Sequence, residues 1–115
     1  MSDVGAQLDR AQILLDIGRV ALARDLILKD LLQDPTNVRA LCLLASCHHA
    51  DEDYAAMLAV ADRAVAADPD HEHGHRIRAL ALLTLGRGKD AELTALEAIR
   101  LAPGLWHGHA LLAAA

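Results

Sequence analysis

The three prolines of the chain, Pro35, Pro69 and Pro103, impose an internal period on the sequence. They are the only prolines, and the two intervals between them are equal: 69 − 35 = 34 and 103 − 69 = 34. Proline disfavours helical backbone in the residue before it, so each proline is expected to follow the end of a helix. A fixed spacing of this length is typical of repeat proteins, in which each repeat is one supersecondary unit. The prolines therefore divide the chain into similar units.

Other residues recur at the same interval and strengthen the repeat. An alanine returns in four successive units, as Ala11, Ala45, Ala79 and Ala113. A glycine stands near the middle of the first and third units, as Gly18 and Gly86. Helices commonly end at a glycine, because glycine readily adopts left-handed backbone. Apolar residues between these breaks follow helical spacing, and in the first unit they include Ile13, Ile17 and the inward-facing Leu32. We therefore expect only helices, with turns near Gly18, Pro35, Asp51, Pro69, Gly86 and Pro103.

The period and these residue types resemble the tetratricopeptide repeat family, whose unit is a pair of antiparallel helices. The resemblance implies an all-α fold, a right-handed solenoid of helix pairs in a single domain. It implies units at 4–37, 38–71 and 72–105 and a terminal helix at 105–115. The family's early tryptophan is replaced by Gln7, Leu41 and His75, which implies looser packing of the core.

Composition and charge exclude several classes of function. The formal net charge is −5 and no basic stripe stands out, so nucleic acid is not expected as a partner. The start of the chain lacks the basic and apolar pattern of a signal peptide, and no apolar run is long enough to span a membrane. Cys42 and Cys47 are the only cysteines. They are five residues apart on one expected helix and point in different directions, so a disulfide between them is not expected. Reduced thiols favour a cytoplasmic location.

No pattern of catalytic or metal-binding residues stands out. Seven histidines suggest metal binding, but only His71 and His75 have the i, i+4 spacing of helical zinc sites, and the paired thiolates of loop zinc sites are missing. The repeat accounts for them better, because His73-Gly74-His75 returns one period later as His107-Gly108-His109. Cys42 and His49 share a helix face but lie about 10 Å apart along it. We therefore expect no catalytic residues, no metal and no cofactor.

The resemblance also implies a concave groove lined by the first helix of each unit. Carrying the family's groove positions onto this sequence places Arg39 and Arg76 there as the permanent cations. The lysines and asparagines with which some family members hold a partner's terminal carboxylate are replaced by Leu8, Gln12, Leu43, His73 and Ile77. The expected partner-binding residues are Leu8, Gln12, Leu15, Arg39, Cys42, Ser46, His49, His73, Arg76, Leu80 and Leu83.

The function that the resemblance implies is a non-enzymatic protein–protein interaction module that binds a peptide or helix of a partner in this groove. The alternative is a scaffold element that self-associates through the ends of the solenoid. The terminal helix favours some association, because residues 105–115 contain no charged side chain, whereas end units of solenoids need polar outer faces. Either the natural chain continues with a second helix that covers this surface, or two chains pack end to end. For the chain as given the sequence favours a homodimer with contacts at Trp106, Leu111 and Leu112.

Overall fold

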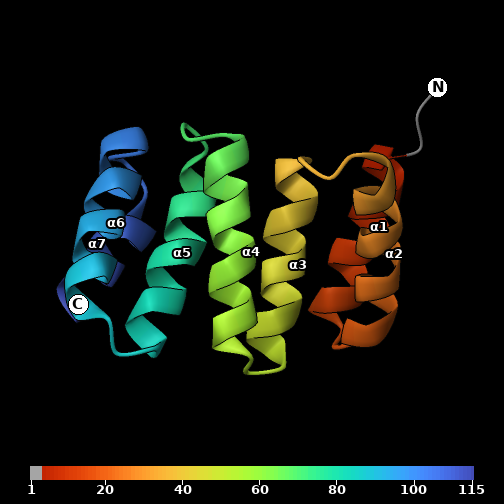
Figure 1. The fold of residues 1–115 in the computed structure, drawn as a ribbon, viewed down its shortest axis with the longest axis horizontal. Coiled ribbons are helices and arrows are strands. Elements are labelled where there is room, and N and C mark those ends of the chain that lie inside the picture. The colour runs from red at the N-terminus through yellow and green to blue at the C-terminus, as the bar shows by residue number, and fades with distance from the viewer. Residues whose placement is uncertain (1–3) are drawn as a thin grey trace.

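The computed structural model describes residues 4–115, and this part of the chain contains seven helices, arranged as a row of three helix pairs followed by one last helix (Figure 1). Their bounds are α1 Val4–Asp16, α2 Val20–Gln33, α3 Val38–Ala50, α4 Tyr54–Ala67, α5 Glu72–Thr84, α6 Gly88–Leu101 and α7 Trp106–Ala114. The first helices begin at residues 4, 38, 72 and 106, and the second helices at residues 20, 54 and 88, so every start recurs with the period of the prolines. The expected all-α solenoid of helix pairs is confirmed.

The helix ends follow from local chemistry. Asn37 and Asp53 cap α3 and α4, because their side chains accept hydrogen bonds from the backbone N–H groups of Ala40 and Ala56. Each proline stands two residues after the end of a second helix, as its backbone constraint predicts. The mid-unit turns place Gly18 and Gly86 in left-handed backbone, with φ of 83° and 78°.

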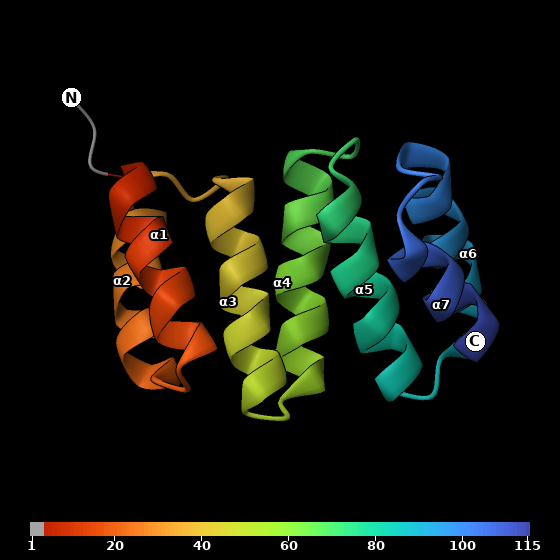
Figure 2. The same ribbon diagram turned by 180° about the vertical axis from the view of Figure 1, so that it is seen from behind.

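The core is thin and built largely from small side chains. Ala11, Ala45 and Ala79 are all fully buried, which lets each first helix approach its neighbours closely. Successive pairs stack side by side, with α1 and α2 at one end of the row and α6 and α7 at the other (Figure 2). The molecule measures 40 × 27 × 21 Å, an elongated shape that follows from contacts between neighbouring units only.

The first unit departs from the expected apolar pattern. Ile13 and Ile17 are exposed, and Leu32 is 84% exposed, so the expectation that these residues face inward is wrong. The physical reason lies in the position of α1 and α2 at the end of the row. Within residues 4–115, α1 packs only against α2 and α3, so no helix covers its far side.

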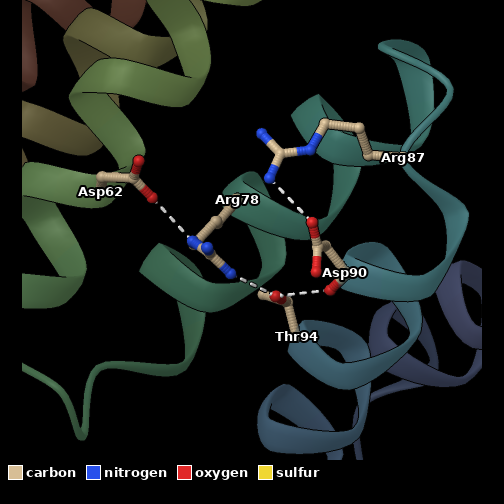
Figure 3. A network of polar contacts seen from close by, with 5 residues as sticks. All are labelled: Asp62, Arg78, Arg87, Asp90 and Thr94. Carbon is tan, nitrogen blue, oxygen red and sulfur yellow. Dashed lines mark hydrogen bonds and ion pairs between the residues drawn. The ribbon is translucent and has the colours of Figure 1, made fainter.

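A polar network joins the last two full units (Figure 3). Its central residues Asp62, Arg78 and Thr94 replace apolar residues found one period earlier, Leu28, Leu44 and Val60. Arg78 on α5 donates to Asp62 on α4 over 2.6 Å and to the hydroxyl of Thr94 on α6 over 2.5 Å. Thr94 in turn donates to the backbone carbonyl of Asp90, whose carboxylate accepts from Arg87. The network thus connects three helices and fixes the orientation of α5 between α4 and α6.

Among the described residues, no helix combines the length and the apolar composition that crossing a membrane would require.

Candidate functional site

A cavity of about 370 Å³ opens between three first helices, α3, α5 and α7. Its lining is mainly apolar on the α5 and α7 sides and carries polar side chains from α3 and from the start of α5. The residues that line it are Ser46, His49, Met57, His73, Arg76, Ile77, Leu80, Trp106, His107, Ala110 and Leu111.

Helix α7 forms one wall of this cavity because it packs closely onto α6. A Cβ atom added to Gly108 would come to 2.9 Å from Ile99 Cγ1 and 3.4 Å from the Ile99 backbone nitrogen. Only glycine therefore fits at this crossing without displacing Ile99. At the start of the same helix the Trp106 and His107 rings stack, with centroids 4.0 Å apart.

Five of the expected partner-binding residues meet in the cavity: Ser46, His49, His73, Arg76 and Leu80. Four others lie outside its lining, namely Gln12, Leu15, Arg39 and Leu83. Arg39 is instead paired with Asp9 on α1, over 2.6 Å.

Two expected groove residues are not accessible to a partner. Leu8 and Cys42 are each only 2% exposed and belong to the core, so their placement on a binding surface is wrong. Each side chain is turned into the packing between neighbouring helices, where a small or apolar group is needed. The surface that a partner can reach is therefore smaller than the full groove that the resemblance implies.

Four lining residues were not among the expected partner-binding residues: Met57, Ile77, His107 and Ala110. The repeat carried a signal for two of them, since His107 and Ala110 lie one period after His73 and Arg76. Trp106 and Leu111 were expected as oligomer contacts, but the structure places both at the cavity wall. Leu112 is half-buried and does not line the cavity.

Arg76 is the one permanent cation among the lining residues. Its Nε lies 3.2 Å from a Glu72 carboxylate oxygen, yet this buried nitrogen has no hydrogen-bond partner within residues 4–115. Burial, together with the positive charge of Arg76 and the nearby imidazoles of His71 and His107, lowers the pKa of His73 to about 4. His73 is therefore neutral at physiological pH, and Arg76 carries the positive charge of the cavity.

The histidines have two distinct environments. The ring nitrogens Nε2 of His75 and His109 lie 2.7 Å and 3.1 Å from the backbone carbonyls of Pro69 and Pro103, respectively. Each Nε2 must donate, because a carbonyl oxygen only accepts. These histidines thus tie the start of a first helix to the proline turn before it.

His71 and His73 make no such bond in the described part of the chain. Instead they lie beside Cys42, and the possible ligand atoms of the three residues all fall within 4.8 Å of one another. The expectation of no metal site considered the spacing along single helices. This cluster forms between α3 and α5, so spacing along one helix gives no sign of it.

Solved structures that are similar to this fold include several repeat domains. The Sgt2 TPR domain from Aspergillus fumigatus has a TM-score of 0.92 and 16% identity, covering 98% of this chain and 76% of that one. The Yersinia enterocolitica type III secretion chaperone SycD, in complex with a peptide of the translocator YopD, has a TM-score of 0.88 and 18% identity, covering 99% and 93%. The second TPR domain of human RPAP3, in complex with the HSP70 peptide SGPTIEEVD, has a TM-score of 0.85 and 18% identity, covering 96% and 95%.

These likenesses, at identities below one quarter, establish the fold. A comparison with curated protein sequences gave no match. The family model described as tetratricopeptide repeat matches residues 8–72 and again residues 52–105, which together include most of the chain. The chain therefore belongs to the tetratricopeptide repeat family.

Proposed function

We propose that this protein is a non-enzymatic protein-interaction module that holds a segment of a partner protein in the cavity between α3, α5 and α7. The observation that carries the proposal is the composition of the cavity lining. Ile77, Leu80 and Leu111 offer apolar contacts, and Arg76 supplies one permanent positive charge. Binding sites of this kind are mostly apolar with a few polar groups that fix orientation. A segment with an apolar side chain next to a carboxylate suits such a lining.

The structural relatives support the general mode of binding but not the identity of the partner. SycD and the second RPAP3 domain were each solved with a partner peptide. The residues with which some family members clamp a terminal carboxylate are changed here, for example to Gln12 and His73. We therefore propose an internal acidic–apolar segment as the ligand rather than a peptide held by its terminal carboxylate.

The cysteines support the non-enzymatic part of the proposal. Burial raises the pKa of the Cys42 thiol to about 11 and also raises that of Cys47. Reactive cysteines need a lowered pKa and access to solvent, and both residues are buried. Two free thiols also suit the reducing cytoplasm, which is the compartment that we propose.

Site-specific crosslinking tests the assignment of the binding surface. A photo-crosslinking amino acid is introduced at Leu80, in the cavity, and at Leu93 on α6 as the control. Leu93 is 67% exposed and lies outside the cavity, so a group placed there is fully accessible to chance encounters. We expect Leu80 to yield a discrete adduct with a different protein in its native cells, and Leu93 to yield none.

The charge of Arg76 is tested in the same experiment. Arg76→Ala is expected to weaken the Leu80 adduct and to reduce its dependence on salt, since a charge at such a site mainly steers and orients the ligand. Adducts formed only from Leu93, or only with a second copy of the chain, would refute the proposed cavity function.

A second proposal is self-association through α7. It is supported by Trp106, which is 69% exposed on a helix without any charged side chain. Leu111 gives less support, because it is half-buried and faces the cavity.

A further inference from the structure

The cluster of Cys42, His71 and His73 brings together ligand types from two consecutive units. Cys42 lies on α3, His71 immediately precedes α5, and His73 stands in the first turn of α5. The cysteine sulfur and one nitrogen of each imidazole all lie within 4.8 Å of one another. Side chains that are far apart in the sequence, at positions 42 and 71, thus face a common point.

These separations are close to those of a bound zinc ion. Zinc–sulfur bonds of about 2.3 Å and zinc–nitrogen bonds of about 2.0–2.1 Å set tetrahedral ligand atoms roughly 3.4–3.6 Å apart. The three atoms therefore need to approach one another by no more than about 1.4 Å. His71 can supply this movement, because it is the N-cap residue of α5 and its side chain makes no capping hydrogen bond.

The donor atoms are also available. His75 and His109 are engaged by proline carbonyls, whereas within residues 4–115 no hydrogen bond occupies the rings of His71 and His73. Cys42 is buried and forms no disulfide.

We propose that Cys42, His71 and His73 form a zinc site that joins α3 to α5. One thiolate and two imidazoles form a borderline-soft donor set that suits zinc, and three protein ligands leave the fourth tetrahedral position to water. On binding, the Cys42 Sγ–H bond breaks, a Sγ–Zn bond forms, and the proton passes to solvent. No electron is transferred, so no oxidant or reductant is required.

The surrounding charges tolerate such an ion. Arg76 lies near Cys42 and would repel a cation. However, Arg76 is paired with Glu72, whose negative charge offsets that of Arg76. The thiolate then neutralises part of the zinc charge. Because His73 also lines the cavity, the metal would fix one part of the cavity wall, and it would do so whether or not a partner is bound.

Metal titration of the purified full chain tests the proposal directly. After removal of metal with a chelator, we expect the protein to bind one equivalent of Zn²⁺ and its melting temperature to rise. With Co²⁺ as a spectroscopic probe, we expect tetrahedral visible bands together with a near-ultraviolet band from thiolate-to-cobalt charge transfer. Absence of stoichiometric zinc uptake, or a cobalt spectrum without the thiolate band, overturns the proposal.

Matched variants identify the ligands. Cys42→Ser should weaken zinc binding at least tenfold, whereas Cys47→Ser, at an equally buried cysteine of the same helix, should leave it unchanged. Binding that is equal in Cys42→Ser and in the unmodified chain overturns the assignment of the thiolate.

His71→Asn keeps the test decisive if Cys42→Ser fails to fold. The residue one period earlier is Asn37, which caps α3 with its side chain, so asparagine at position 71 should cap α5 in the same way. We expect this variant to be at least as stable as the original chain without metal, and to bind zinc at least tenfold more weakly. His49→Asn is the control for loss of a nearby histidine, and zinc affinity that is lowered equally by both variants overturns the proposal.

Discussion

Glu52 has left-handed backbone at the position where the other two mid-unit turns have glycine. Its φ is 58°, close to the values at Gly18 and Gly86. The turn nevertheless keeps its hydrogen bonds, since the N–H groups of Glu52 and Asp53 donate to the carbonyls of His49 and His48 over 3.0 Å and 2.9 Å. A side chain in this conformation is unfavourable by about 1–2 kcal/mol. The repeat geometry is thus maintained at Glu52 against a local backbone preference.

Glu52→Gly should therefore increase the free energy of unfolding by up to about 1 kcal/mol, because the strain is removed and part of the gain is lost to the flexibility of glycine. The reverse change at the equivalent turn, Gly86→Ala, should lower it by a similar amount. Urea denaturation followed by circular dichroism measures both. A loss of stability in Glu52→Gly would contradict the backbone argument.

Asp30 is a buried carboxylate where the next two units have Ala64 and Ala98. It is 4% exposed, and its Oδ2 has no hydrogen-bond partner in the described residues. Burial raises the pKa of Asp30 above its ordinary value of 3.8. The folded state therefore holds the proton more tightly than the unfolded state, and stability falls as the pH rises from about 4 through the folded pKa.

Asp30→Ala is accordingly expected to stabilise the protein at pH 7 by roughly 1–3 kcal/mol, the usual penalty of an unsatisfied buried polar group. The gain should shrink as the pH is lowered towards 4, where the carboxyl group of Asp30 becomes protonated. Chemical denaturation at several pH values measures the effect. Asp25→Ala, at an exposed position of α2, is the control and should show little change at either pH.

At the scale of helices, the crossing of α7 on α6 is tighter than the equivalent crossing of α5 on α4. Gly74 and Gly108 occupy the same position in successive units, but their surroundings differ. A Cβ atom at Gly74 would meet Val65 Cγ2 at 3.6 Å, an ordinary contact, whereas one at Gly108 would meet Ile99 at 2.9 Å. The packing of α7 on α6 therefore requires glycine at position 108, whereas the packing of α5 on α4 has room for a side chain at position 74.

Gly74→Ala should stabilise the protein by about 0.5–1 kcal/mol, because alanine favours helix over glycine and Ala40 already occupies this position one unit earlier. Gly108→Ala should instead loosen α7 from α6. Fluorescence of Trp106, the only tryptophan, reports the second change locally, since its ring stacks on His107 at the start of α7. Equal gains of stability in both variants would show that Ile99 adapts freely.

The helices could be predicted from the sequence, but the contacts between them could not. The sequence predicted turns near Gly18 and Pro35, and α2 spans Val20–Gln33 between them. That prediction needs only local backbone rules, which act within a few residues. The meeting of Cys42 with His71 and the seating of Gly108 on Ile99 depend on the rotation of one helix against another. Small residues such as Ala45 permit several rotations, so the sequence alone leaves this open.

At the scale of the molecule, the outer face of α7 is the main surface without a covering helix at the C-terminal end of the row. In the described chain, α7 packs against α5 and α6 only, and Trp106 and Leu105 are exposed. Solenoid ends usually present polar side chains to water, and α7 has no charged residue. Twofold pairing of two such faces is the simplest closed arrangement that covers them.

Sedimentation equilibrium at micromolar concentration should therefore yield a mass near twice the 12.3 kDa of one chain. Trp106→Glu should shift the equilibrium to the monomer, because it places a charge in the proposed contact. Leu93→Glu, which adds the same charge at a similarly exposed position of α6, should leave the dimer intact. A monomer in the unmodified chain would mean that the half-buried Leu111 and Leu112 already remove enough apolar surface for α7 to end the solenoid unaided.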